Sequence, residues 1–399
     1  MHELRASAAS LLPALIDLRR RLHRRPEVGL ALPETQAVIL DALAPLGFAT
    51  RTGRSLSSVI ARLDGHRSGP TVLLRADMDA LPMPEENAVE WRSEIAGRAH
   101  ACGHDAHVSM LLGAAKLLAE RRDQLAGSVL FVFQPGEEAC GGAQRMLDEG
   151  LFDREFAGEI AQAFAIHQFP TIPGGSIALR TGALMAAMDG FRITVCGRGG
   201  HGSAPHQTID PVTIACEIVT ALQTFVARRV PVFDPAVISV GKISAGTAPG
   251  VIPDHAVLEG LARSVSDATR AIVTHGLHTL PCAIASAYGA TTRVEVGTGD
   301  LESLPLTWND PQITAFTREV AADLVGASGV IDLQAPIMAS EDFSFMLQRV
   351  PGVMVFLGTQ PEGCDAPEPI HSPRMMLDEA QLATGAALHA AFALRALAG

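Results

Sequence analysis

The sequence predicts an α/β protein: both ends of the chain form one α/β domain, and a ferredoxin-like α+β domain is inserted between them. Two observations predict this fold class. Short apolar runs alternate with helical patterns over residues 10–179 and again over residues 311–397. Between these regions the patterns follow the order β-α-β-β-α-β, which is that of a ferredoxin-like unit. The expected boundaries are residues 1–184 and 299–399 for the terminal domain and residues 185–298 for the inserted domain.

The first part of the terminal domain alternates helices and strands. Residues 10–48 predict two helices separated by Pro26, because proline ends a helix. Helical spacing of apolar residues also predicts a helix over residues 108–118, and a short helix is expected over residues 142–149. Apolar, β-branched runs predict strands at residues 58–63, 71–76, 129–133, 160–166 and 176–179.

The inserted region and the C-terminal region follow in the same way. In the inserted region we expect strands at residues 191–196, 236–243, 251–263 and 292–296, and helices at residues 211–228 and 267–288. Near the C-terminus we expect helices at residues 311–324, 341–347 and 378–397, and strands at residues 329–334 and 353–357. Ser340 before two acids is typical of a helix N-terminus, so the helix at residues 341–347 should begin there. Gly182 and residues 297–299 are expected hinges between the domains.

Composition excludes several classes of function. The net charge of −12 over 399 residues argues against nucleic acid as a partner, because phosphate binding needs clustered cations. No run reaches the roughly 18 apolar residues of a membrane span, and the N-terminus lacks the hydrophobic stretch of a signal peptide. The six cysteines are scattered, which favours a reducing, cytoplasmic location.

The adjacent acids Glu137 and Glu138 carry the most chemical information. They follow the predicted strand 129–133 and a Gln-Pro-Gly break. Neighbouring side chains diverge in extended chain, so one carboxylate can bind a metal ion while the other acts as a base. Upstream, Cys102 and His104 are two residues apart in a segment rich in nitrogen and sulfur ligands. Together these segments indicate metal-assisted hydrolysis.

Other candidate residues are weak when taken alone. Asp77 and Asp79 follow a strand, where acids orient ligands but also occupy ordinary surface loops. His167 ends a strand, where a satisfied polar group is the more common role, and His371 lies in a loop stiffened by two prolines. Residues 197–202 match G-x-G-x-x-G, but no helix follows directly, so we reject dinucleotide binding and expect a flexible loop that presents His201.

The ordered motifs together resemble one known family. They are similar to the dinuclear metallo-amidohydrolases that include aminoacylase, hippurate hydrolase and the auxin-conjugate hydrolases. The matching segments run nearly from end to end: residues 20–27, 74–82, 100–105, 133–138, 199–206, 251–253 with Arg263, 340–343 and 371–373.

This resemblance implies a metallopeptidase-like catalytic domain with two divalent metal ions per subunit, with zinc, manganese, nickel or cobalt as candidates. The implied metal ligands are Cys102, His104, Glu138, His167 and His371. The resemblance further implies that Glu137 is the general base and that Asp79, or Asp77, orients a ligand.

The resemblance also assigns roles in the inserted domain, which would be a lid and dimerisation domain. His201 would reach the partner subunit's active site and polarise the scissile carbonyl, and Arg263 would anchor the substrate carboxylate. Gly250 stands where the family usually has asparagine, so substrate binding near this position is expected to differ.

The implied function is hydrolysis of the amide bond of N-acyl L-amino acids, of acetyl or benzoyl type. The alternatives are a dipeptidase or exopeptidase on the same scaffold and a non-catalytic metal-binding protein. The expected partners are a small-molecule substrate and a second copy of the chain, with neither nucleic acid nor membrane.

Overall fold

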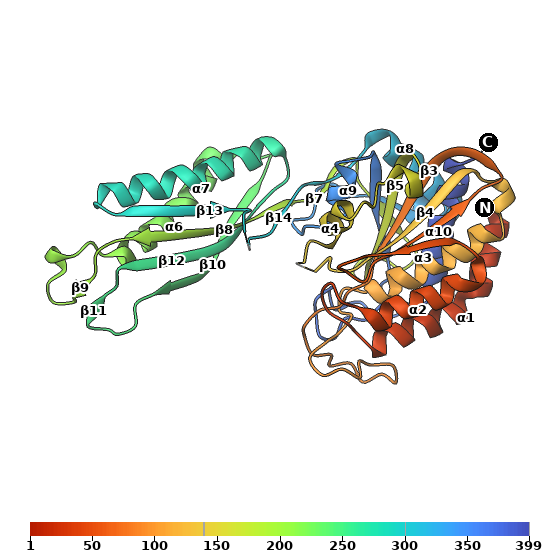
Figure 1. Cartoon of the computed structure of the whole chain (residues 1–399), viewed down its shortest axis with the longest axis horizontal. Coiled ribbons are helices and arrows are strands. Elements are labelled where there is room, and N and C mark those ends of the chain that lie inside the picture. The colour runs from red at the N-terminus through yellow and green to blue at the C-terminus, as the bar shows by residue number, and fades with distance from the viewer. Residues whose placement is uncertain (139, 300, 399) are drawn as a thin grey trace. The chain divides into compact units, whose positions relative to one another are not determined.

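A computed structural model describes residues 1–138, 140–299 and 301–398, which form two compact units (Figure 1). The terminal unit comprises Met1–Leu184, Trp308–Ala335 and Asp342–Gly399. The inserted unit comprises Met185–Thr307 and Pro336–Glu341.

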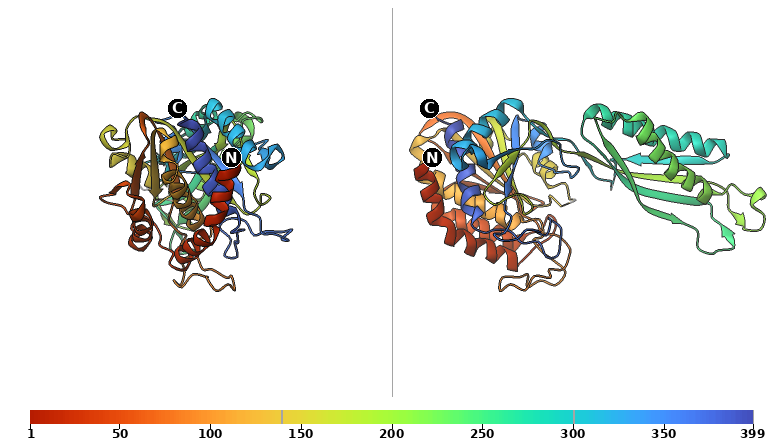
Figure 2. Two further views of the ribbon diagram at one scale, coloured as in Figure 1. Left: turned by 90° about the vertical axis from the view of Figure 1, so that its right-hand side faces the viewer. Right: turned by 180° about the vertical axis from the view of Figure 1, so that it is seen from behind.

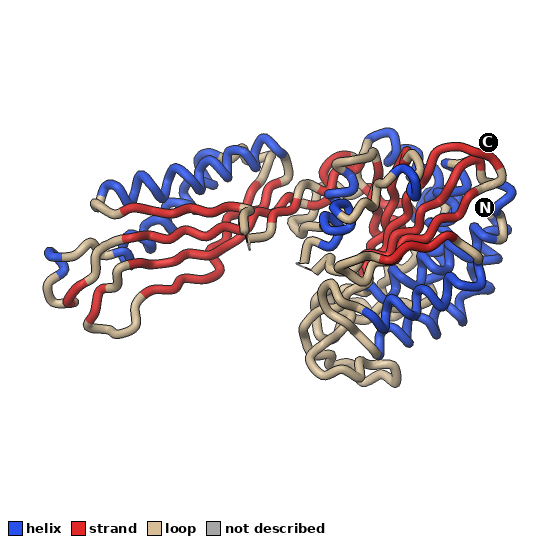
Figure 3. The backbone as a smooth tube through the Cα atoms, in the orientation of Figure 1, coloured by secondary structure: helices blue, strands red, loops and turns tan. Residues whose placement is uncertain are grey.

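The terminal unit is built on a mixed sheet whose strand order, within the described residues, is β1-β2-β4-β3-β5-β17-β6-β16 (Figure 3). Its four central strands, β4, β3, β5 and β17, run parallel to one another. The strand bounds are β1 Ala49–Thr52, β2 Val59–Asp64, β3 Arg67–Asp77, β4 Ala126–Gln134, β5 Ile160–Phe169, β6 Ile177–Leu179, β16 Val330–Asp332 and β17 Gly352–Gly358.

The central strands consist of nearly continuous buried apolar residues, because both faces of the sheet are covered. The helices of this unit are α1 His2–Arg24, α2 Pro33–Leu43, α3 His104–Ala119, α4 Gly142–Asp148, α5 Arg154–Ala157, α8 Pro311–Val325, α9 Ser344–Leu347 and α10 Gln381–Ala396. α3 is buried along nearly its whole length, where it packs between α1 and α10. The first and last helices of the chain therefore share one core (Figure 2).

The inserted unit has an antiparallel sheet of order β10-β12-β8-β13, with β14 also paired to β8. Its strands are β8 Ala187–Cys196, β10 Ala236–Ala245, β12 His255–Ser264, β13 Thr291–Val296 and β14 Ser303–Leu304. The helices α6 Pro211–Arg229 and α7 Asp267–Ala287 contribute to a single core with one face of this sheet (Figure 2). Beyond the sheet, β9 Gly200–His201 pairs with β11 Val251–Ile252. A further pair, formed mainly by residues of the terminal unit, consists of β7 Gly182–Met185 and β15 Thr307–Asn309.

Several local expectations were wrong. α1 begins at His2, ahead of the expected start at residue 10, and it continues through Pro13 in its middle, where the proline removes one backbone hydrogen bond. The predicted strand 251–263 is two strands, β11 and β12, interrupted at residues 253–254. The predicted helix 341–347 is reduced to α9, which begins at Ser344. Its cap position is Phe343, because the Ser340 hydroxyl is engaged elsewhere, with Arg263.

The compact units also divide the chain differently from the expected boundaries in two places. β14 pairs with β8 and so extends the inserted unit to Thr307. The segment Pro336–Glu341 groups with the inserted unit as well, because the Ala186 N–H donates to the carbonyl oxygens of Ile337 and Ala339. Among the helices of the described residues, none is long and apolar enough to cross a membrane.

Candidate metal centre

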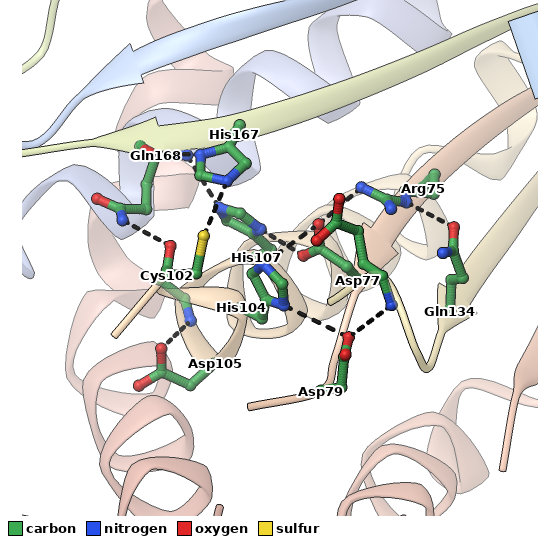
Figure 4. Close-up of polar contacts among 12 residues, drawn as sticks. Arg75, Asp77, Asp79, Cys102, His104, Asp105, His107, Gln134, His167 and Gln168 are labelled. Carbon is green, nitrogen blue, oxygen red and sulfur yellow. Dashed lines mark hydrogen bonds and ion pairs between the residues drawn. The ribbon is translucent and has the colours of Figure 1, made fainter. Parts of the chain in front are cut away.

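The site lies at the carboxyl ends of neighbouring parallel strands in the terminal unit (Figure 4). β3 ends at Asp77, β4 ends at Gln134, and His167 lies near the end of β5. In open α/β sheets, ligands bind outside this edge. The segment after β3 contributes Asp79, and the loop after β4 contributes the two adjacent acids. Three strand ends therefore bring polar side chains from distant parts of the sequence together.

The Cys102–His104 turn is shaped by its central glycine. Gly103 adopts φ +85°, and a Cβ atom there would lie 2.6 Å from Gln168 Nε2. That amide donates to the Cys102 carbonyl oxygen at 2.7 Å, while Thr359 donates to Gln168 Oε1 at 2.7 Å. Only glycine accommodates both the positive φ and this close approach. The two potential ligands are thus presented by a rigid turn at the start of α3.

The five ligands expected from the sequence fall into two overlapping groups. The ligand atoms of Cys102, His104 and His167 lie within 4.8 Å of one another, and so do those of Cys102, Glu138 and His371. The Cys102 sulfur is 3.4 Å from His167 Nε2, and His371 Nε2 is 3.3 Å from Glu138 Oε1. Cys102 belongs to both groups, so its sulfur adjoins two candidate cation sites.

The hydrogen bonding of these residues fits a bound cation. His167 Nδ1 donates to the Gln168 carbonyl oxygen at 2.6 Å, which leaves the Nε2 lone pair pointing toward Cys102. Asp79 Oδ1 lies 3.5 Å from His104 Nδ1 and favours a proton on that atom. Among the described residues, the buried atom His104 Nε2 has no hydrogen-bond partner. Unpartnered buried polar atoms are costly, and a cation would satisfy them.

Electrostatics favours ionised acids at this site. Burial raises the pKa of Asp77, but His104, His107 and Arg75 outweigh it and hold that pKa well below its usual range. Likewise, the hydrogen bond from His371 and the charge of His104 overcome burial and lower the pKa of Glu138. Hydrogen bonds to Cys102 and Glu138 raise the pKa of His371 to about 10. The cluster therefore holds its carboxylates in the ionised form, in which they can bind a cation.

His107 is close to the cluster but does not serve as a ligand. Its Nδ1 bonds to Asp77, and its Nε2 accepts from the Gln168 N–H at 2.9 Å, so both ring nitrogens are used. Asp77 and His107 together connect β3, α3 and β5 behind the site (Figure 4). Asp77 thus orients His107, whereas Asp79 faces His104.

The loop that contains Glu137 and Glu138 is fixed at its centre by Asp79. The two carboxylate oxygens of Asp79 accept the backbone N–H groups of Glu137 and Glu138, each at 3.0 Å. Asp79 is 1% exposed, so these bonds are shielded from water. The role expected for Asp79, orienting a ligand, remains a prediction; the structure adds that it holds the backbone of both acids.

Both ends of the same loop converge on Asp342, a residue whose contribution the sequence did not reveal. Asp342 Oδ1 accepts from Gln134 Nε2 at 2.6 Å, and its Oδ2 accepts from the Ala143 N–H at 2.9 Å. Arg75 Nη2 lies 3.1 Å from Asp342 Oδ1, and Nη1 of the same guanidinium is 2.7 Å from Asp77. Asp342 and Arg75 are both buried. This buried network ties the loop to the sheet. The only sign of it in the sequence was the acid pair at residues 341–342, which resembled the start of a helix.

His371 occupies a strained backbone position. Its φ is +66°, and it is the one non-glycine residue with positive φ in the described part of the chain. Such a conformation costs on the order of 1 kcal/mol or more and persists when surrounding structure imposes it. Here the His371 N–H donates to the Ala101 carbonyl oxygen at 2.9 Å, which aligns the loop with the Cys102 turn.

The three remaining candidates lie in the inserted unit. His201 and Gly250 are exposed and adjoin the β9–β11 pair, where the Gly202 N–H donates to the Gly250 carbonyl oxygen at 2.8 Å. His201 Nδ1 accepts the Ser203 N–H at 3.1 Å. An amide can only donate, so the proton of the neutral ring must be on Nε2. Arg263 is half-buried on β12.

Most of the chain matches a known protein family. The model of "Peptidase family M20/M25/M40" matches residues 73–395. The chain belongs to this family. Curated relatives match it almost from end to end: thermostable carboxypeptidase 2 of Saccharolobus solfataricus is 38% identical over 96% of this chain and 95% of its own length. IAA-amino acid hydrolase ILR1-like 2 of Arabidopsis thaliana is 37% identical over 96% and 85%. N-acetyl-L-cysteine deacetylase of Bacillus subtilis is 37% identical over 92% and 84%.

Solved structures of similar proteins share the fold. A putative aminohydrolase from methicillin-resistant Staphylococcus aureus superposes with a TM-score of 0.92 at 29% identity and covers 99% of both chains. A Bacillus subtilis protein described as a dinuclear metal-binding peptidase of the M20 family has a TM-score of 0.82 at 32% identity, covering 97% of this chain and 99% of its own. The family resemblance and fold class predicted from the sequence are thus confirmed.

Proposed function

We propose that this M20 protein hydrolyses the amide bond of N-acyl L-amino acids and releases a carboxylic acid and a free amino acid. The observation that supports it most directly is the pair of overlapping ligand groups beside the fixed Glu137–Glu138 loop. The relatives named as N-acetylcysteine deacetylase and IAA-amino acid hydrolase support the same bond type.

Two divalent cations are proposed as cofactors. The ligands would be Cys102, His104 and His167 for one, and Cys102, Glu138 and His371 for the other. Thiolate and imidazole ligands favour zinc, nickel or cobalt, and the carboxylate also admits manganese. When bound, such ions supply Lewis-acid polarisation of a carbonyl and a water that ionises near neutral pH.

Glu137 is proposed as the general base. Its backbone N–H is anchored by Asp79, so the carboxylate starts from a defined position next to the ligand Glu138. Glu137 would take the proton of the attacking water and deliver it to the nitrogen of the departing amine. Because Glu138 is committed to the cation, the two adjacent carboxylates would have separate roles.

His201, Arg263 and Gly250 are proposed to act on the substrate. The proton on His201 Nε2 would donate to the scissile carbonyl oxygen as negative charge develops on it. Arg263 would bind the carboxylate of the amino-acid part. Gly250 offers open space, because no atom lies within 4 Å of the position that a Cβ atom would take there, and it would admit bulkier substrate groups than an asparagine would.

We further propose that the chain acts as a homodimer in the cytoplasm, with the inserted unit as lid and dimerisation domain. All six cysteines are free, as a reducing compartment would require. A second function, carboxypeptidase or dipeptidase activity, is favoured by the thermostable carboxypeptidases among the relatives.

The test is a hydrolysis screen of metal-stripped protein reloaded separately with zinc, manganese, cobalt or nickel. N-acetyl, N-benzoyl and dipeptide derivatives of the same amino acids are compared. We expect the highest kcat/KM for N-acyl amino acids. Faster cleavage of dipeptides would instead support the exopeptidase, and inactivity in every metal-loaded form would support a non-catalytic metal-binding protein.

A further inference from the structure

Arg263 differs from the other buried or half-buried arginines of the inserted unit in its partners. Arg192 pairs with Glu259 at 2.9 Å, and Arg270 pairs with Asp189 at 2.7 Å. Among the described residues, no carboxylate forms an ion pair with Arg263. Burial lowers its pKa, and no acid compensates. A half-buried guanidinium without an anion is an unfavourable arrangement unless a ligand provides one.

The partners that Arg263 does have are neutral, and both contact the same nitrogen. Nη1 donates to the Met338 carbonyl oxygen and to Ser340 Oγ, each at 2.8 Å. Nη1 has two hydrogens, so these two bonds use both. The remaining donors are Nε and Nη2, which lie side by side along one edge of the planar group. Two parallel N–H bonds from such an edge match the two oxygens of a carboxylate.

The segment that contains Ser340 is itself fixed within the inserted unit. The Ala186 N–H donates to the carbonyl oxygens of Ile337 and Ala339, at 3.1 Å and 2.9 Å. Arg263 lies on β12 between Val237 of β10 and Met188 of β8, so its backbone is held on both sides. Both partners of the Arg263–Ser340 bond are therefore preorganised by backbone pairing, and binding a ligand would require little ordering.

We propose that Ser340 is a specificity-determining positioning residue: with the Met338 carbonyl, it holds Nη1 of Arg263 so that the Nε–Nη2 edge binds the free carboxylate of the substrate. The inference rests on the proposed function and narrows it to substrates with an unblocked carboxylate. N-acyl amino acid amides and esters, which have the same scissile bond but no anion, would be bound poorly. Ser340 itself does not touch the substrate.

The test compares N-acetyl-L-alanine with N-acetyl-L-alaninamide. In Ser340→Ala, Arg263 loses one of two anchoring acceptors, and we expect KM for the carboxylate substrate to rise about tenfold with kcat within about twofold. The constants for the amide should stay unchanged, so the preference for the carboxylate falls by the same factor. Ser340→Thr, which keeps the hydroxyl, should retain the wild-type preference for the carboxylate substrate.

Ser303→Ala is the matched control, because Ser303 Oγ also bonds an arginine, Arg270, at 2.9 Å, but that arginine is already neutralised by Asp189. It should leave the preference unchanged. The inference would be overturned if Ser340→Ala kept the wild-type preference for the carboxylate over the amide, or if Ser303→Ala lost this preference to the same extent.

Binding separates this inference from the proposed function. Calorimetric Kd values for the same two compounds are measured in the Glu137→Gln background, with and without Ser340→Ala. If the wild type hydrolyses neither compound but the preference in binding depends on Ser340, the proposed function fails and the carboxylate site stands. If hydrolysis occurs but binding preference is independent of Ser340, the function stands and the role of Ser340 is refuted.

Discussion

Cys102, His104 and His167 in the terminal unit are 1–6% exposed, whereas His201 and Gly250 in the inserted unit are exposed on a pair of two-residue strands. Buried hydrogen bonds with Gln168 of β5 fix Cys102 and His167, whereas bonds from the backbone N–H groups of Ser203 and Gly202 hold His201 and Gly250. Buried polar networks are rigid and costly to disturb. Changes that break the buried hydrogen bonds of the metal centre should therefore affect stability and metal affinity, while changes in the inserted unit should affect substrate binding and turnover.

The largest effect is expected from Glu137→Gln. Removing the general base should lower kcat about a thousandfold, while the metal content measured by elemental analysis stays at the wild-type level, because Glu137 belongs to neither of the two proposed ligand groups. Glu138→Gln is the matched control, since it should lower metal content as well. Turnover close to normal in Glu137→Gln would refute the assignment of the base.

Asp342→Asn breaks the buried network that holds both ends of the loop containing Glu137 and Glu138. Removing one partner of a buried ion pair costs about 3 kcal/mol of unfolding free energy, and metal affinity should fall at least about tenfold because the loop bearing Glu138 loosens. Urea unfolding and metal titration measure the two effects.

The control for this change is Asp332→Asn, which removes the acid from an exposed pair with Arg318. It should cost less than about 1 kcal/mol and leave metal affinity unchanged. Equal costs for the two variants would contradict the difference between buried and exposed networks.

His201→Ala tests the expected behaviour of an exposed candidate residue in the inserted unit. The loss of one donor to a developing oxyanion should lower kcat about a hundredfold, with a smaller change in KM and no change in unfolding free energy, because His201 is exposed. His255→Ala, another exposed histidine of the same unit, should have no effect. A pure KM effect in His201→Ala would argue against contact in the transition state.

The smallest expected effect concerns pH and the buried His389 of α10. Burial lowers the pKa of His389 to about 3, below the value of about 6.5 for an unfolded histidine. Between these values the unfolded chain binds a proton that the folded chain does not, so stability falls as pH falls below 6.5. The contribution is about 1.4 kcal/mol per pH unit.

His389→Leu should reduce the slope of the unfolding free energy between pH 6.5 and 5.5 by about 1.4 kcal/mol per pH unit in urea unfolding, whereas the exposed His66→Leu should leave it at the wild-type value. Identical slopes in both variants would show that His389 is not held neutral by the core.

Much of this molecule could be predicted from the sequence because its signals are local. Apolar runs predicted the central strands, and the Gln134–Gly136 break predicted that the loop containing Glu137 and Glu138 lies at a strand end. The exposed β1, Ala-Thr-Arg-Thr, has no apolar run and was missed. The short strands β7, β9, β14 and β15 are too brief for a periodic signal, and β11 was predicted only as part of a longer strand.

Other features depend on contacts between distant residues. The bonds of Asp342 to Gln134 and Ala143 join positions about 200 residues apart, and Ser340 meets Arg263 across 77 residues. Taken locally, Ser340 and Asp342 resembled a helix start, because the same residue types cap helices and anchor tertiary networks. The positive φ of His371 likewise has no local sequence signal, since only the surrounding structure imposes it.

The most direct test of the central claim is anomalous X-ray diffraction from crystals of the zinc-loaded protein, recorded on both sides of the zinc absorption edge. Two anomalous peaks are predicted in each chain. One should contact His104 and His167, the other Glu138 and His371, and both should adjoin the sulfur of Cys102. The absence of peaks there, or zinc bound only elsewhere, would contradict the account of a two-cation hydrolase.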